Sequence, residues 1–301
     1  MGKFVYSAAV AAVFGVALAS GGGIAATAAV PTVLSTVQSA GVTGVAPGPS
    51  NTGVAWGTVL TKHYGDLRIT TPGTVIDRME IFGLVRVEAA NVTIKNSIVR
   101  GRDITTNISL IYAGDASVKN LLVQNVELAP LKKSPNINGI NGSNFTLQNV
   151  NIHDVVDSVH IFGDNVTVAS SWLHNNTHFV NDPNWNGGPS HDDNVQVQSG
   201  SNIRLVNNTM SGAVNSVLQV TQDQGVVSNL TVENNTVAGG ACTLNVAQKA
   251  RGAIIGLSIR SNIIGASTYN CPMIVDAPTL AIATITGNIR PDGTTAKIVS
   301  R

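Results

Sequence analysis

The stretch Asn91-Val-Thr-Ile-Lys-Asn96 decides the fold, because the same phrase recurs along the chain. In each copy a turn residue, usually Asn, precedes alternating apolar and polar positions. The copies occupy residues 91–96, 144–149, 165–168, 202–207, 229–234 and, more loosely, 256–261. Their first residues are 53, 21, 37, 27 and 27 positions apart, and the longest interval holds a degenerate copy that starts at Ser117 (SVKNLLV). A repeat of this length with two-residue alternation predicts a solenoid built from strands.

A unit of 21–27 residues with several short strands predicts one rung of a parallel β-helix. A single rung cannot bury its inward face, whereas stacked rungs bury Val, Ile and Leu continuously and pair each strand with the next rung. Asn suits the corners because it tolerates left-handed backbone angles. The Leu frame of leucine-rich repeats is absent, and the unit is shorter than a propeller blade of about 40 residues.

These motifs resemble the right-handed parallel β-helix superfamily of pectin-lyase-like proteins, which includes many secreted bacterial proteins. The resemblance extends over about residues 58–290. It implies an all-β fold, a single-stranded right-handed parallel β-helix, which we assign to residues 51–301. Members of the superfamily include polysaccharide lyases, glycoside hydrolases, epimerases and non-catalytic proteins, so the fold does not give the activity.

Composition and the N-terminus indicate an exported protein. Charged residues make up 12% of the 301 residues, and the net charge of +1 argues against nucleic acid as a partner. Lys3, the apolar run 4–19 and Ala26-Thr27-Ala28 together predict a signal peptide over residues 1–28. Residues 29–50 are then a flexible tether. We expect a secreted monomer that has no membrane contact after signal cleavage.

Aligning the rungs by their apolar alternation predicts one outward polar column, because side chains alternate across a strand. The column comprises His160, Gln196, Gln219 and Asn245. A second column, two residues further on, comprises Phe162, Gln198, Thr221 and Ala247. Asp157 and Asp193 each precede a column member by three residues, which places them at the entry to this face. The alternative is that the Gln and Asn column is only a structural amide stack.

An insertion beside this face adds the strongest functional signal. The interval that contains residues 174–193 is about ten residues longer than its neighbours, and five of the six His residues lie between positions 153 and 191. Loops on a rigid scaffold commonly carry function. Here the insertion contributes His191, several Asp residues and Trp185, an aromatic that can stack on a sugar ring.

The first function hypothesis is a lyase that cleaves an acidic, uronate-containing polysaccharide by β-elimination. This reaction needs a base and a group that neutralises the uronate carboxylate, and His160, Lys249 and Arg251 are candidates for these roles. His191, Asp157 and Asp193 complete the catalytic set, while Trp185, Thr221 and the column amides bind substrate. Related lyases of the superfamily combine Ca²⁺ with Lys or Arg, so we expect Ca²⁺ at four carboxylates. They are Asp154, Asp157, Asp192 and Asp193.

Two other functions remain open. A glycoside hydrolase would use Asp157 with Asp192 or Asp193 as acid and base, and a carbohydrate-binding or cell-surface module would use no catalyst. Cys242 and Cys271 are 29 residues apart, close to one rung, so they could form a disulfide between neighbouring rungs or remain two free thiols.

Overall fold

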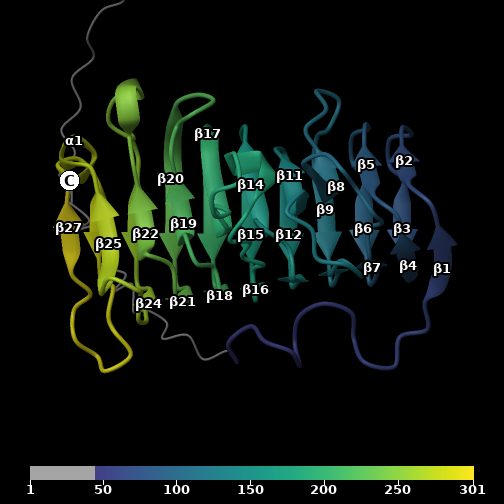
Figure 1. Cartoon of the computed structure of the whole chain (residues 1–301), viewed down its shortest axis with the longest axis horizontal. Helices are drawn as coiled ribbons and strands as arrows, with labels where there is room; N and C mark the ends of the chain where they lie inside the picture. Colours follow the sequence, from purple (N-terminus) through teal and green to yellow (C-terminus); the bar gives the residue numbers. More distant parts are fainter. Residues whose placement is uncertain (1–44) are drawn as a thin grey trace, which may run out of the picture. The chain divides into compact units, whose positions relative to one another are not determined.

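The computed structural model describes residues 45–301 as a stack of parallel strands in three sheets (Figure 1). The strands follow the sequence from β1 at one end of the stack to β27 at the other. The fold prediction of a parallel β-helix is therefore confirmed. The predicted signal peptide and residues 29–44 of the predicted tether lie outside the described residues. In residues 45–301 no helix is long and apolar enough to cross a membrane.

Each rung contributes one strand to each of three sheets, which we call A, B and C in chain order. Sheet A comprises β1 (Thr61–Tyr64), β4 (Met79–Phe82), β7 (Ile98–Val99), β10 (Glu127–Leu128), β13 (Asn151–His153), β16 (Trp172–His174), β18 (Thr209–Ser211), β21 (Thr236–Ala238) and β24 (Ile263–Ile264). Sheet B comprises β2 (Leu67–Ile69), β5 (Val85–Val87), β8 (Ile108–Ala113), β11 (Ile137–Gly142), β14 (Val159–Phe162), the first part of β17 (Asp193–Val206), β19 (Ser216–Val220), β22 (Cys242–Val246), β25 (Cys271–Val275) and β27 (Ile298–Ser300).

Sheet C comprises β3 (Val75–Asp77), β6 (Thr93–Lys95), β9 (Leu121–Gln124), β12 (Phe145–Gln148), β15 (Val166–Ala169), the second part of β17, β20 (Val227–Glu233), β23 (Ser258–Arg260) and β26 (Thr284–Thr286). Three short helical turns interrupt the strands: η1 (Pro183–Trp185), η2 (Lys249–Arg251) and α1 (Ala277–Leu280). Before β1, residues 45–60 run along the outside of the stack, where the Gly53 amide donates to the Asn149 carbonyl.

The recurring phrase is a sheet-C strand bracketed by two sharp corners. Asn91 and Asn96, on either side of β6, both have positive φ, as do the Asn residues that flank β9 and β12. Asn tolerates this left-handed backbone better than other residues that have a side chain. The copy that we placed at Ser117 is out of register, because β9 is flanked by Asn120 and Asn125. The true copy is Asn120-Leu-Leu-Val-Gln-Asn125.

The interior of the stack is aliphatic, with one polar strip. Inward-facing residues from all three sheets form a single core, and Val159, Val195, Leu218 and Leu244 are its contribution from one position of sheet B. The strip is a run of buried Asn residues in which each amide donates to the next carboxamide oxygen at 2.8–3.0 Å. It comprises Asn208, Asn235, Asn262 and Asn288. Burial of these amides is tolerated because their hydrogen bonds are satisfied.

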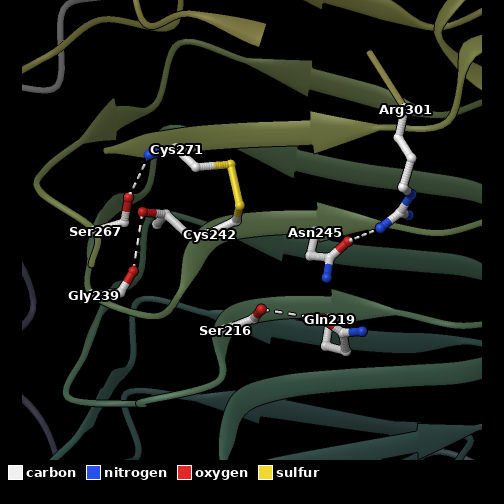
Figure 2. Close-up of a disulfide and its surroundings, with 9 residues drawn as sticks. Ser216, Gln219, Gly239, Cys242, Asn245, Ser267, Cys271 and Arg301 are labelled. Atoms are coloured by element: carbon white, nitrogen blue, oxygen red, sulfur yellow. Dashed lines mark hydrogen bonds between the residues drawn. A yellow bond between two sulfur atoms is a disulfide. The ribbon is translucent and has the colours of Figure 1, made fainter. Parts of the chain in front are cut away.

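A disulfide joins two neighbouring rungs near the C-terminal end. Cys242 of β22 and Cys271 of β25 are register partners with a Cα–Cα distance of 4.7 Å, and their sulfur atoms are bonded (Figure 2). The hydroxyl of Ser267 accepts a hydrogen bond from the Cys271 amide at 2.8 Å. Of the two alternatives left by the sequence, the disulfide is therefore the correct one.

We expect the double change Cys242→Ser and Cys271→Ser to lower the free energy of unfolding by about 3–4 kcal/mol, because the bridge restricts a loop of some thirty residues in the unfolded chain. Denaturant unfolding without reductant measures the difference. As a control, reductant should destabilise the wild type and leave the double variant unchanged. Equal stability of the two proteins would show that the bridge does not constrain the unfolded chain.

Candidate functional site

Four successive connections in the middle of the stack lie at one corner, and the last of them, residues 175–192, is the longest in the stack. They join a sheet-A strand to the following sheet-B strand and comprise residues 100–107, 129–136, 154–158 and 175–192. We call these four segments the A–B corner. They belong to successive rungs, because β7, β10, β13 and β16 pair in that order. Insertions on one side of a solenoid commonly line its binding surface.

The structure confirms the predicted first column. His160 pairs in register with Gln196, Gln196 with Gln219, and Gln219 with Asn245. The column continues to Asn141 on the preceding rung, a neighbour of His160 that the sequence analysis did not include. These side chains point away from the core because the flanking aliphatic residues are buried.

The predicted second column is wrong at its start. A register shift follows Ile161, so Phe162 pairs with Ser199 and not with Gln198. An extra residue in one strand moves every later side chain relative to the neighbouring strand. The alternation of apolar residues within a single strand does not show where such a shift occurs between two strands.

A cavity of about 100 Å³ lies where the A–B corner meets the first column. Six predicted site residues line it: Asp157, His160, Trp185, His191, Gln196 and Gln198. The rings of Trp185 and His191 stack on each other with their centroids 3.7 Å apart. The structure therefore brings together residues that come from β14, from β17 and from the insertion before β17.

Six further residues line the cavity that the sequence analysis did not assign to the site: Asn107, Pro135, Asn138, Val156, Asp182 and Asn184. Asn184 ties the insertion to the preceding segment, since its amide donates to the Pro135 carbonyl and to the Asn136 side chain, both at 3.0 Å. Asp182 lay within the insertion that the sequence singled out. The segments that carry Asn107 and Pro135 gave no signal, because they fall in the 53-residue interval where the repeat was read out of register.

Two buried carboxyl groups lie at the base of this site. Asp157 and Asp193 are 5% and 0% exposed, and one Asp157 oxygen accepts a hydrogen bond from the Asp193 amide at 2.9 Å. Burial, together with nearby carboxylates, raises the pKa of Asp157 to about 7 and raises the pKa of Asp193 well above its ordinary value. The Asn215 amide donates to one Asp193 oxygen at 2.9 Å, while the other oxygen is buried and has no partner among residues 45–301.

His160 is neutral at physiological pH. Burial lowers its pKa from 6.5, because a charged imidazolium would lose its hydration. Both ring nitrogens are buried without a hydrogen-bond partner among the described residues, and Nδ1 lies 3.5 Å from an Asp157 oxygen, which is too long for a strong hydrogen bond. The Gln198 side chain lies near the ring, and its contact partly opposes the lowering of the pKa.

Two of the carboxylates that we expected around Ca²⁺ have partners within the protein. Asp154 binds Lys133 at 2.8 Å and His153 at 2.7 Å. Asp192 accepts hydrogen bonds from His178 at 2.6 Å and from the Val214 amide at 2.7 Å. Within residues 45–301, no group of three or more His, Cys, Asp or Glu side chains is arranged to hold a metal ion. The calcium prediction stays untested, and no step below depends on it.

The remaining predicted residues lie away from the cavity. Lys249 and Arg251 are in η2, which follows the C-terminal end of β22, whereas the A–B corner precedes the sheet-B strands. Lys249 binds Asp223 at 2.7 Å, and Arg251 donates to the Gln222 carbonyl at 2.6 Å. Gln219, Thr221 and Asn245 follow on later rungs and do not line it. The Gln219 side chain accepts a hydrogen bond from Ser216, and Asn245 accepts one from Arg301 (Figure 2).

The buried carboxyl pair predicts a particular dependence of stability on pH. A carboxyl group whose folded pKa is raised favours folding most when it is protonated, so stability should fall as the pH rises from about 4 to about 7. We expect Asp193→Asn to raise the free energy of unfolding at pH 8 and to have little effect at pH 4, because the amide cannot carry the buried charge.

Denaturant unfolding at several pH values measures this difference. Asp103→Asn is the matched control, because this exposed carboxylate should leave the pH profile unchanged. A parallel profile for wild type and Asp193→Asn would contradict the raised pKa.

Comparison with known proteins adds no family assignment. No protein-family model matches the chain, and no curated protein matches it. Among solved structures, the chain is similar to the Dettilon tailspike protein (gp208), with a TM-score of 0.44 and 10% sequence identity. The match covers 80% of this chain and 61% of the tailspike chain, so this chain spans less than two thirds of that protein. A likeness this weak carries no argument, and the assignment of a parallel β-helix rests on the strand pairing described above.

Proposed function

We propose that this chain is an exported polysaccharide lyase that cleaves a uronate-containing glycan by β-elimination in the cavity of the A–B corner. One observation carries the proposal: His160, whose lowered pKa favours the neutral form, lines a cavity together with amide side chains and the protonatable carboxyl group of Asp157. The disulfide supports export, because disulfides persist in oxidising compartments.

His160 is the proposed base. In β-elimination a base removes the proton on C5 of the uronate, the electron pair forms the C4–C5 double bond, and the oxygen on C4 departs. A neutral imidazole with a free nitrogen can accept that proton, and its lowered pKa keeps it unprotonated at neutral pH. Asp157, with an oxygen 3.5 Å from Nδ1, would stabilise the imidazolium once it has itself given its proton to the departing oxygen.

Amide groups are the proposed partners of the uronate carboxylate. The amides of Gln196, Gln198 and Asn138 line the cavity, and each can donate to a carboxylate. Donors at that position acidify the C5 proton because they stabilise the negative charge that develops on the carboxylate. They take the role that we first gave to Lys249 and Arg251, which lie beyond the other end of β22.

Asp157 is the proposed acid for the departing oxygen. Its raised pKa, about 7, leaves much of it protonated at neutral pH, and it lines the cavity beside His160. A protonated carboxyl group can donate to the C4 oxygen as the glycosidic bond breaks. Before the reaction, His160 is then an unprotonated base and Asp157 a protonated acid, and both are uncharged.

The direct test is incubation of the full chain with a panel of acidic polysaccharides, with ultraviolet absorbance of the unsaturated product and reducing ends measured in parallel. We expect both signals to rise together. Reducing ends without absorbance would contradict β-elimination and indicate hydrolysis. Binding without either signal would indicate a non-catalytic carbohydrate-binding module.

Replacing the proposed base should remove most of the activity. We expect His160→Ala to lower kcat/KM by about 10²–10⁴-fold, the usual contribution of a positioned general base. Gln219→Ala is the matched control, because Gln219 belongs to the same column but does not line the cavity; its kcat/KM should stay within about twofold of wild type. Equal losses in the two variants would argue that the column acts through stability alone.

The pH dependence should identify the acid. Activity should fall below the lowered pKa of His160 and should also fall as the pH rises above about 7, where Asp157 loses its proton. In Asp157→Asn the overall rate should drop and the alkaline limb should disappear, because an amide does not titrate. An alkaline limb that persists in this variant would exclude Asp157 as the acid.

A glycoside hydrolase is the second candidate. Asp157 and Asp182 both line the cavity, and inverting and retaining hydrolases use a pair of carboxyl groups. No Lys or Arg is among the described residues that line this cavity, which would suit a neutral glycan. This pair replaces the combination of Asp157 with Asp192 or Asp193, because Asp192 and Asp193 do not line the cavity.

A further inference from the structure

A second and larger cavity lies on the A–B corner beside the proposed catalytic cavity. Its volume is about 600 Å³, within the range of 300–1,000 Å³ common for ligand pockets. Residues 102–106 and 132–136 form most of its lining, and Pro135 lines both cavities. The smaller cavity, at about 100 Å³, is below that range, so a polysaccharide bound there must extend onto a neighbouring surface.

The larger cavity combines apolar side chains with cations. Leu84, Ile104 and Ile108 give it apolar surface that can contact the face of a sugar ring. Its three cations are Arg102, Lys132 and Lys133, and Asp103 is the one acidic residue in its lining. The catalytic cavity has the opposite character, since Asp157 and Asp182 line it without Lys or Arg.

The two lysines are available to a ligand to a greater degree than Arg102. Arg102 is held by Asp66 through three contacts of 2.8–3.1 Å. Lys132 contacts Asp103 at 3.2 Å, but the two side chains are 75% and 79% exposed, and such ion pairs contribute little. Lys133 contacts Asp154 at 2.8 Å, and its ammonium group retains further N–H donors.

The two cavities are neighbours across the segment that carries Pro135, which lines both. Asn184 of the insertion binds Pro135 and Asn136 of this segment, as described above. One chain of linked sugars can therefore contact both cavities.

We infer that the cavity lined by Lys132 and Lys133 is an anion-binding subsite, which holds the carboxylate of the uronate next to the one that is cleaved. The inference rests on the proposed function and deepens it, because it names the substrate class: glycans in which acidic sugars are consecutive. A methyl-esterified chain lacks the negative charge and loses this interaction.

Binding and turnover of the double variant Lys132→Ala/Lys133→Ala test the inference. The probes are tetrasaccharides of galacturonate and of mannuronate, together with the methyl ester of each, titrated calorimetrically at low and moderate salt. We expect the change to weaken binding of a free-acid probe at least tenfold, to reduce its salt dependence, and to leave the ester unaffected. With a polymeric substrate, KM should rise while kcat stays constant, because the lost interaction is equally strong in the ground and transition states.

Lys95→Ala/Lys119→Ala is the matched control, because it removes the same two positive charges. Lys95 lies in β6 of sheet C and Lys119 in the connection before β9, and neither residue lines either cavity. Unsaturated product with an unchanged KM in the Lys132/Lys133 variant would overturn the subsite and leave the proposed function standing. Lysine-dependent, ester-sensitive binding without product from any acidic polysaccharide would support the subsite and overturn the proposed function. Equal loss of binding in both double variants would overturn the subsite, because it would reflect net charge alone.

Discussion

The parallel register of the rungs is the constraint on which the rest of the structure depends. Inward aliphatic side chains such as Val159, Val195 and Leu218 stack directly on one another, so a slip of one residue would turn polar side chains into the core. The same register fixes the outward positions between them. The register that stacks the aliphatic core residues also makes His160 and Gln196 neighbours. The scaffold therefore positions these two side chains without a hydrogen bond between them.

The corners of the rungs divide structural work from functional work. Several corners that flank the sheet-C strands use Asn with positive φ, whose side chains bond from rung to rung, as Asn120 does with Asn91 at 3.1 Å. The A–B corner lacks this ladder in the middle rungs, and there the chain accommodates residues 175–192 and the cavities beside them.

Buried charge at the A–B corner is costly, and the surrounding contacts show how the cost is limited. Asp157 accepts a backbone amide and Asp193 accepts the Asn215 amide, yet one Asp193 oxygen has no partner among the described residues. Burial shifts both groups toward the protonated form, which avoids two adjacent negative charges in a poorly hydrated site. The buried Asn ladder limits its cost in another way, because each carboxamide oxygen accepts a hydrogen bond from the amide of the preceding rung.

The sequence by itself determined the fold and the polar column from His160 to Asn245, because alternation and repeat spacing are local properties that persist when the rungs stack. It also located the long insertion within residues 174–193, from which the candidate site takes part of its lining. It could not reveal the register shift after Ile161, the true repeat copy at Asn120, or the separation of Lys249 from His160. Those features depend on which end of a strand each loop leaves and on how rungs of unequal length align. Only the tertiary structure decided that Asp182, Asn138 and Asn107 share a cavity with His160, since their distance along the chain carries no information about their distance in space.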